Sequence, residues 1–285
     1  MTAAAVLAAE GRFRAARARR RRDLALGGTA FLLAVLAAAW VGEVSLSRLA
    51  RGLPLAWDYV LRTIPALHAA TLGADIADWM WGFGDWVALL GDTLLIAYVG
   101  TVLGAMVALP ASFAAAATLA PGWVVMLARR MLEFARTVPT LVLALVFVYA
   151  FGLGPFAGVL AIAVHTAGAL GKLFAEEHEN AALAPVEAVR AVGGSWPAQM
   201  RFGVLPQSLP GVLSLGLLRF EINVREASVL GIVGAGGIGE ELYLAVRQFE
   251  YQDISAILVL ILLTVAAIDL LCGVLRRRVI GGRAA

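Results

Sequence analysis

Long apolar windows recur along this chain, and they constrain its fold more than any other feature of the sequence. A helix that crosses the hydrocarbon core of a bilayer needs about 20 mainly apolar residues. Six windows qualify as such helices: residues 24–44, 86–109, 139–152, 156–174, 209–224 and 254–274. We therefore predict an all-α polytopic membrane protein with about six transmembrane helices.

The overall composition also favours a bilayer. Apolar residues make up 61% of the 285 residues and charged residues only 15%, and the mean hydropathy is +0.85. A water-soluble globule of this size needs more polar side chains to cover its surface. The composition therefore argues against a cytosolic enzyme, a disordered tail and a secreted domain.

Arginines mark both ends of the chain. They are dense within residues 12–22, before the first apolar window, and form the run 276–278 after the last. The positive-inside rule counts Lys and Arg close to membrane segments, so both termini are expected in the cytoplasm, and six crossings agree with that. Nucleic-acid binding is not expected, because the basic cluster lacks interleaved aromatic side chains and adjoins an apolar window.

The expected organisation is a single membrane domain with polar ends. Residues 1–23 form a basic cytoplasmic segment and residues 276–285 a basic cytoplasmic tail. Residues 24–85 hold the first transmembrane helix, which is long for a cleavable signal sequence and is taken as an uncleaved anchor, and an extracytoplasmic loop. Residues 86–275 hold the other helices, with a cytoplasmic loop at 175–206. Tryptophans suited to a membrane interface lie in or beside the extracytoplasmic loop: Trp57, Trp79, Trp81 and Trp86.

The third and fourth windows are close together in the sequence. Gly152, Gly154 and Pro155 separate them, and such residues favour a tight turn. We therefore predict that these two helices form a hairpin with little polar chain between them.

No catalytic or metal site can be assembled from the sequence. Cys272 is the only cysteine and the three histidines are far apart, which excludes an intrachain disulfide and leaves no ligand cluster. No Ser-His-Asp set, paired-carboxylate cleft or HExxH helix is present. Gly171 and Lys172 are followed by Leu173, so there is no phosphate-binding Walker loop. We expect no enzyme activity, no metal and no cofactor bound by this chain.

The loop at 175–206 is the most informative polar segment, because so long an insert between two helices must be folded, flexible or docked to another protein. Ala188 and Ala191 are small enough to let a short helix lie close to a partner, and Gly193 and Gly194 would end that helix. This pattern favours docking. An ordinary amphipathic helix with chance spacing is the alternative.

Six residues of this loop resemble the EAA signature of ATP-binding-cassette importer permeases. That signature reads Glu-Ala-Ala, three residues, Gly, nine residues, Ile, one residue, Leu-Pro. The spacing is the same here, but Val189 replaces the second Ala and Gly203 replaces the Ile. The positions that carry the resemblance are Glu187, Ala188, Val189, Gly193, Leu205 and Pro206.

The resemblance implies that the loop is a coupling helix, part of an L-shaped pair, whose tip fits a groove on an ATPase subunit. It further implies a type I importer with the fold of the methionine permeases, in which residues 86–275 are the permease domain. The expected partners are a second permease copy, identical or paralogous, two cytoplasmic ATPase subunits and an extracytoplasmic substrate-binding protein. ATP and Mg would be bound by the ATPase.

A second resemblance, to the phosphonate permease family, is carried by residues 219–231. Together with residues 132–139 and 152–174, this likeness covers most of the chain beyond Trp86. A glycine-rich segment follows at 232–239 and is closely similar to one in the methionine permeases. The resemblance implies import of phosphonate, or of a related oxyanion such as phosphite or phosphate. Alternatives are a permease for methionine or another small solute, an ion-driven secondary transporter, and a membrane-embedded enzyme or assembly factor. The residues that favour phosphonate permeases are Arg219, Phe220, Glu221, Asn223 and Arg225.

The glycine-rich segment also contains the pattern G-x-G-x-x-G, which occurs in dinucleotide-binding folds. Such a fold needs several soluble βα units around the turn, whereas apolar windows lie on both sides here. In a permease, the glycines would permit close helix packing and a bend near the outer gate, where two copies meet. They are Gly234, Gly236, Gly237 and Gly239.

Charged residues occur inside the apolar windows, where each costs free energy unless it is paired or hydrated. Arg219, Glu221, Arg225 and Glu226 lie in or beside the fifth window and Asp269 in the sixth. Glu221 and Arg225 are four residues apart and are expected to pair on one helix face. Two interpretations stay open: structural ion pairs between helices, or a positive potential from Arg219 or Arg225 along the route of an anionic substrate.

Overall fold

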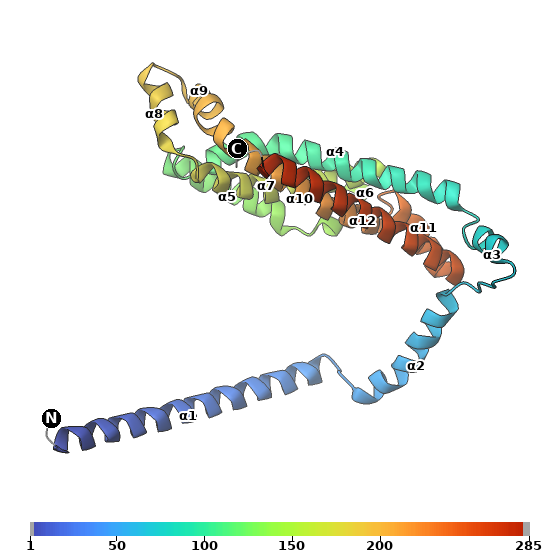
Figure 1. Cartoon of the computed structure of the whole chain (residues 1–285), viewed down its shortest axis with the longest axis horizontal. Coiled ribbons are helices and arrows are strands. Elements are labelled where there is room, and N and C mark those ends of the chain that lie inside the picture. Colours follow the sequence, from blue (N-terminus) through green and yellow to red (C-terminus); the bar gives the residue numbers. More distant parts are fainter. Residues whose placement is uncertain (1–2, 282–285) are drawn as a thin grey trace. The chain divides into compact units, whose positions relative to one another are not determined.

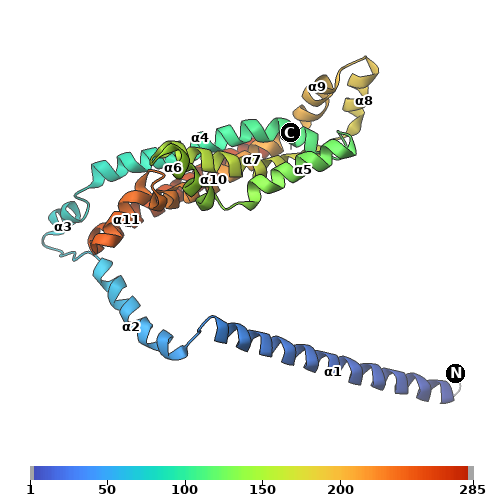
Figure 2. The same cartoon turned by 180° about the vertical axis from the view of Figure 1, so that it is seen from behind.

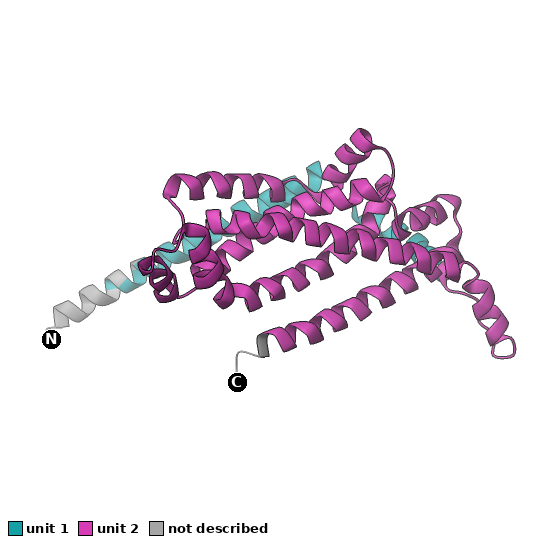
Figure 3. Cartoon of the chain, turned by 90° about the horizontal axis from the view of Figure 1, so that it is seen from above, with its two compact units in different colours: residues 1–61 teal, residues 62–285 magenta. Residues whose placement is uncertain are grey.

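A computed structural model describes residues 3–281, and every regular element in this part of the chain is a helix (Figure 1). The predicted all-α fold is thereby confirmed. The chain divides into two compact units, residues 1–61 and residues 62–285 (Figure 3).

The first unit consists of α1 (Ala3–Val41) and most of α2 (Leu46–Thr63). α1 contains a candidate membrane span, Ala16–Val41, whose apolar part follows Asp23. Just after α1, Glu43 has a φ of +50°, a left-handed conformation that does not continue a helix. The first span therefore stops at Val41, short of its predicted end at residue 44.

The second unit is a helical bundle. A π-helical turn, Gln199–Val204, leads into α10, and a 3-10 turn, Gly231–Val233, follows it. The helices in chain order are α3 (Leu72–Trp79), α4 (Phe83–Ala115), α5 (Gly122–Thr137), α6 (Thr140–Phe151), α7 (Pro155–Glu179), α8 (Leu183–Ala191), α9 (Trp196–Ala198), α10 (Leu205–Leu230), α11 (Ile238–Gln248) and α12 (Tyr251–Gly281).

Four helices have the length and apolar composition of membrane spans, and up to six spans result if each of two bent pairs counts as one. The four are in α1, α4, α7 and α12. The bent pairs are α5 with α6, at 83°, and the segment Trp196–Val233 with α11, at 49°. The six predicted spans correspond to these four helices and two bent pairs.

The third predicted span needs correction. The apolar window 139–152 forms only the 12-residue α6, which is too short to cross a bilayer alone. α5 precedes it and adds 16 residues, but carries arginines that hide it from a search for apolar windows. The turn after α6 agrees with the predicted hairpin, since Gly152 and Gly154 have φ of +90° and +131° and α7 begins at once with Pro155.

α4 and α7 pack closely at the centre of the second unit. A Cβ atom added at Gly100 would lie 2.7 Å from Ile162 Cγ2, and one at Gly104 would lie 2.7 Å from Thr166 Cβ. Since neither position has room for a side chain, the two backbones approach as they do in small-residue contacts between membrane helices. The main buried cluster around them gathers residues of α4, α6, α7, α10 and the turn after α10.

The two ends of this bundle differ in the segments they carry (Figures 1 and 2). α8 and α9 project at one end, where α12 also finishes, and this is named the α8 end. α3 and α11 lie at the other, named the α11 end. There the indole of Trp79 donates to Ser255 at 2.9 Å and that of Trp81 to Asp253 at 3.1 Å, which fixes the start of α12 beside α3.

Candidate functional site

The segment with the EAA-like spacing forms α8, and most of α8 is exposed. Glu187 and Ala188 face solvent and Val189 is half-buried, whereas Val186 is buried against the π-helical turn. A Cβ atom at Gly203, in that turn, would lie 2.9 Å from the Val186 Cα. The glycine that replaces the Ile of the signature therefore lets the chain pass directly against α8.

α8 ends at two glycines, as the sequence predicts. Gly193 has a φ of +83°, and the amides of Gly193 and Gly194 donate to the carbonyls of Arg190 and Val189 at 2.9 Å. This is the pattern of a helix C-terminus closed by a left-handed residue. Space around Gly193 is open, so only its backbone conformation demands glycine. The chain reverses here and presents an exposed tip.

Side-chain hydrogen bonds fasten this tip to the rest of the bundle. The Gln207 amide on α10 donates to the Ala182 carbonyl at 3.1 Å and accepts from the Ala182 amide at 3.0 Å. The Trp196 indole donates to the Leu119 carbonyl at 2.8 Å. The start of α8 is thus tied to the first turn of α10, and α9 is tied to the loop between α4 and α5. Leu205 and Pro206 form the first turn of α10.

His178 is a buried junction that the sequence analysis did not single out. Its two ring nitrogens lie 2.9 Å from the Ser208 hydroxyl and 3.0 Å from the Ser112 hydroxyl, and its ring stacks on Phe113 at 4.2 Å. These contacts join α4, α7 and α10 at the α8 end. A lone histidine near the end of an apolar window gives no sequence signal of such partners.

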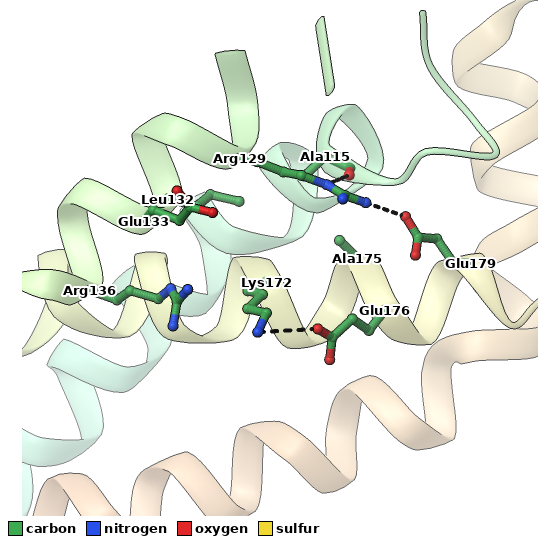
Figure 4. A pocket seen from close by; sticks show the side chains of 9 residues that line it. All are labelled: Ala115, Arg129, Leu132, Glu133, Arg136, Lys172, Ala175, Glu176 and Glu179. Carbon is green, nitrogen blue, oxygen red and sulfur yellow. Dashed lines mark hydrogen bonds and ion pairs between the residues drawn. The ribbon is translucent and has the colours of Figure 1, made fainter. Parts of the chain in front are cut away.

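A small pocket lies between α5, α7 and the end of α4 (Figure 4), with a volume of about 160 Å³. Arg129 donates to the Glu179 carboxylate at 2.7 Å and to the Ala115 carbonyl at 2.9 Å, so it caps the end of α4. Lys172 pairs with Glu176 at 3.4 Å. Within each of these pairs the two opposite charges neutralise each other. We therefore interpret the pocket as a contact that holds the helices together and not as a ligand site.

Arg219 lies buried in the middle of α10 and contacts α7 and a carboxylate of its own helix. Its guanidinium donates to His165 Nδ1 at 2.7 Å and reaches the Glu226 carboxylate at 3.3 Å. Glu226 also accepts from the Thr140 hydroxyl at 2.8 Å. A charged group inside a membrane span is costly unless it is paired, and here the pairing draws together α6, α7 and α10.

Asn223 extends this polar cluster by one turn. Its amide nitrogen donates to the hydroxyls of Thr101 at 2.7 Å and Thr166 at 2.9 Å, and the side chain is fully buried. Its amide oxygen has no hydrogen-bond partner among residues 3–281. The residues joined in this way are called the polar cluster below: Arg219, Asn223, Glu226, Thr101, Thr140 and Thr166.

The expected pair of Glu221 and Arg225 does not form. Glu221 instead accepts from Arg276 of α12 at 2.8 Å, and Arg225 reaches Asp269 of α12 at 3.8 Å. Arg225 contributes only a 3.3 Å hydrogen bond to the Glu221 main-chain carbonyl. The partners lie on α12 because that antiparallel helix packs along α10, which sequence spacing alone does not reveal. These contacts favour the interpretation of structural ion pairs for Glu221 and Arg225.

The glycine-rich segment is a compact turn between α10 and α11 at the α11 end. Gly234, Gly236 and Gly237 have φ of +77°, +81° and +82°, a region that glycine adopts without penalty. A Cβ atom at Gly239 would clash with the Ser228 carbonyl, and one at Gly231 would lie 2.8 Å from the Gly239 Cα. The predicted bend and close packing are both present, and a 3-10 turn precedes the glycines in place of a strand.

α10 connects the two groups of candidate residues. It begins at Leu205, directly after the π-helical turn, and runs to Leu230, beside the glycine-rich turn. Arg219 and Asn223 lie between these ends. The polar cluster therefore lies along α10 between the α8 tip, which precedes this helix, and the glycine-rich turn, which follows it.

Comparison with protein families gives an independent result. A sequence model of a family described as "Binding-protein-dependent transport system inner membrane component" matches residues 100–281. The matched part contains α8, α10, the glycine-rich turn and all of α12.

Individual relatives are similar over most of the chain. A putative phosphite transport system permease protein, HtxC of Stutzerimonas stutzeri, is 37% identical over 261 residues, which are 91% of this chain and 88% of the relative. The phosphite transport system permease protein PtxC of the same organism is 37% identical over 90% of this chain and 89% of its own. The phosphate-import permease protein PhnE of Mycolicibacterium smegmatis is 40% identical over 69% of this chain and 37% of its own.

Solved structures share the fold. An inward-facing conformation of the MetNI methionine ABC transporter superposes with a TM-score of 0.61 at 23% identity, over 70% of this chain and 97% of the other. An amino acid ABC transporter gives a TM-score of 0.55 at 17% identity, over 70% of this chain and 98% of the other. The predicted methionine-permease fold is confirmed.

Proposed function

This chain belongs to the family of binding-protein-dependent transport system inner membrane components, and on that premise we propose that it imports phosphonate or a related phosphorus oxyanion. It is a multi-pass membrane protein and the permease subunit of an ATP-binding-cassette importer, not an enzyme. Support for the cargo comes from the two relatives that match nine-tenths of the chain, both of which are named for phosphite transport.

Arg219 is the observation that carries the cargo proposal. A phosphorus oxyanion presents several acceptor oxygens, and a guanidinium binds such groups through charge-assisted hydrogen bonds. The Thr166 hydroxyl lies 3.4 Å from Arg219 Nε, and the Thr140 hydroxyl donates to Glu226, the carboxylate partner of Arg219. The donors thus have the chemistry that this cargo requires.

In this structure the Arg219 guanidinium donates to the two carboxylate oxygens of Glu226, at 3.3 and 3.4 Å. These distances are long for a charge-assisted hydrogen bond, and the Glu226 side chain is 28% exposed. We infer that oxygens of the passing anion replace this carboxylate during transport and that Glu226 neutralises Arg219 when no anion is present.

The energy source lies outside this chain. The exposed tip of α8, with Glu187, Ala188 and Gly193, is proposed to fit a groove on a cytoplasmic ATPase subunit. Two such subunits would bind ATP and Mg, and this chain would bind no cofactor. The family description already implies a substrate-binding protein, which would deliver the anion from the extracytoplasmic side.

A second permease copy, identical or paralogous, is proposed to complete the pathway. One chain supplies up to six spans, and we infer that the pathway runs between two symmetry-related copies and not through one small bundle. The glycine-rich turn at the α11 end would lie at the outer gate, where the two copies meet.

ATP-driven closure of the ATPase pair would draw the two α8 tips together and move α10 with them. Because α10 connects the tip to the glycine-rich turn, its tilt would close the inner mouth and open the outer one. This is alternating access by rigid-body motion. Hydrolysis would then restore the inward-facing state.

The proposed orientation follows from the coupling role. If the α8 end faces the cytoplasm, the end of α12 does so as well, because both lie at the same end of the bundle. The N-terminal arginines before the span in α1 would then also be cytoplasmic. The α11 end would face the substrate-binding protein.

Methionine is the main rival cargo, and its support is limited to the fold, since the methionine transporter is only 23% identical. The test is uptake of radiolabelled phosphite, methylphosphonate, phosphate and methionine by vesicles with the reconstituted complex, with and without ATP inside. We expect ATP-dependent uptake of at least one phosphorus oxyanion and none of methionine. Uptake of methionine alone would refute the proposed cargo. Uptake that is the same with and without ATP would refute the proposed mechanism.

A further inference from the structure

α2 separates its apolar side chains from its charged ones more sharply than α1, the other helix of the first unit. On a helix with 3.6 residues per turn, its leucines and its tryptophan fall on one side and its arginines on the other. Leu55 is the exception on the polar side. The apolar side consists of Leu46, Leu49, Leu53, Trp57, Val60 and Leu61.

Within the described residues of the first unit, nothing covers this apolar side. Leu49 is 59% exposed, Leu53 61% and Trp57 64%, and no residue of α2 is buried. A contiguous apolar face of this extent rarely faces water on a soluble surface and marks a site of contact with a membrane or a protein.

The polar side of α2 carries arginines whose contacts keep them on that side. Arg48 pairs with Glu43 at 3.0 Å, and the Arg51 guanidinium donates to the Ser47 carbonyl at 3.2 Å. Both contacts hold the arginines away from the apolar side, so neither guanidinium lies across it. Arginines on one side and a tryptophan on the other are typical of helices that lie in a lipid interface.

The position of α2 in the chain brings it to the bilayer surface. The apolar window of α1 ends at Val41 and α2 begins at Leu46. Four connecting residues reach at most roughly 14 Å even when fully extended, and the headgroup layer on each side of a bilayer is about 5–8 Å thick. α2 therefore starts within or beside the headgroups whenever α1 spans the membrane.

α2 is unsuited to crossing the bilayer itself. It has 18 residues, with Arg48, Arg51 and Asp58 spread along it and Pro54 inside it, and it is not among the helices apolar enough to span. A helix that is strongly amphipathic yet carries these charges lies in the interface plane, with its apolar face at the boundary of headgroups and acyl chains.

We propose that α2 is an interfacial helix that binds lipid: its leucines and Trp57 enter the acyl-chain boundary, and Arg48 and Arg51 contact anionic headgroups. The occupant of its apolar face is thus the bilayer and not a second protein. α2 then holds the span in α1 at a fixed depth and rotation relative to the membrane surface.

The test uses the fact that Cys272 is the only cysteine. In a Cys272→Ser background, single cysteines replace Leu49, Leu53, Ser47 or Arg51 in the full chain, within the importer complex in vesicles of phosphatidylethanolamine and phosphatidylglycerol. Each carries a nitroxide spin label. Its collision rates with oxygen, which concentrates in lipid, and with a water-soluble nickel chelate are measured by electron paramagnetic resonance.

For each label, the ratio of its collision rate with oxygen to its collision rate with the chelate is compared. We expect this ratio to be at least several-fold higher at positions 49 and 53 than at positions 47 and 51, where collisions with the chelate should dominate. If all four labels collide freely with the chelate, α2 lies in water and the proposal is wrong. If labels at 49 and 53 are shielded from both reagents, a protein covers the face and the proposal is equally wrong. Neither outcome depends on the cargo or on ATP.

A paired substitution checks the cause. Leu53→Asp places a charge on the apolar face, and Ser47→Asp places the same charge on the polar face. With the label at position 49, Leu53→Asp should reduce oxygen collisions several-fold, while Ser47→Asp should leave them nearly unchanged. Equal effects of the two substitutions would contradict an orientation set by lipid.

Discussion

Arg219 and Glu226 are seven residues apart on α10, and the guanidinium of one lies 3.3 Å from the carboxylate of the other. Two helical turns bring them onto the same face. Arg219 is 10% exposed and Glu226 28%, so the pair sits at the border between the packed bundle and an accessible space. This geometry makes Arg219 the buried cation most directly placed to meet an anion.

Replacement of Arg219 is predicted to impair uptake far more than replacement of Arg225. Hydrogen bonds to charged groups are worth about 1.5–3 kcal/mol, so Arg219→Ala should reduce maximal uptake roughly ten- to hundredfold. Arg225 is exposed, and its pair with Asp269 is long at 3.8 Å. Arg225→Ala should therefore reduce uptake only a few-fold. The measurement is vesicle uptake with saturating binding protein, in complexes shown by co-purification to be assembled. Near-normal uptake by Arg219→Ala would contradict anion binding by Arg219 and would mean that this residue has a structural role alone.

Substitution of Gly239 is predicted to destabilise the turn at the α11 end. A Cβ atom there would clash with the Ser228 carbonyl, whereas one at Gly216 in α10 would meet nothing within 4 Å. Overpacking of this kind costs about 1–3 kcal/mol, so Gly239→Ala should lower the thermal midpoint in detergent. Gly216→Ala is the matched control and should leave it equal or slightly higher, since alanine favours a helix. Equal midpoints for both variants would show that the turn is not tightly packed.

The conformation of Gly193 is predicted to matter for coupling. Its φ of +83° costs an L-residue roughly 1–2 kcal/mol, and asparagine tolerates it better than β-branched residues do. Gly193→Val should therefore uncouple ATP hydrolysis from uptake while insertion remains normal, and Gly193→Asn should retain more of the coupling. Hydrolysis and uptake are measured in the same vesicles. The same ratio of uptake to hydrolysis in all three proteins would argue against a role for this turn.

Loss of Arg276 is predicted to destabilise the contact between α10 and α12. Glu221 is 8% exposed and Arg276 31%, and the two pair at 2.8 Å. Removal of one partner of a fully buried pair costs about 3–5 kcal/mol, so the loss of this partly buried pair should cost less than that. Lys172→Ala is the control, because the Lys172–Glu176 pair is more than half exposed and is worth about 0.3–0.5 kcal/mol. Thermal unfolding of the two variants in detergent compares them. A midpoint for Arg276→Ala no lower than that of Lys172→Ala would mean that Glu221 finds another partner or becomes hydrated.

The spans of α4, α7 and α12 could be predicted because long apolar windows identify helices in a bilayer whatever their neighbours. α5 could not, since its arginines are tolerated only through partners such as Glu179 on α7. The end of α8 at Gly193 was predictable from local backbone preference. The partners of Glu221 and Arg225 were not, because they depend on how α12 lies along α10.

The polar cluster was predicted only in part. Arg219 and Asn223 attract notice as polar residues in an apolar window, but Thr101, Thr140 and Thr166 do not, since threonine is common in membrane helices. Their hydroxyls acquire a role only when α4, α6 and α7 pack around α10. Such convergence of ordinary residues from distant segments requires the tertiary structure.

Contact between α8 and the ATPase is the most direct test of the proposed coupling. A cysteine at Ala188, in the Cys272→Ser background, is treated with a short thiol-reactive crosslinker in vesicles that carry out ATP-dependent uptake. We predict a crosslink from the α8 tip to the ATPase subunit and protection of this cysteine from membrane-impermeant reagents added on the extracytoplasmic side. No crosslink in an actively transporting preparation, or labelling from the extracytoplasmic side, would contradict the coupling role of α8.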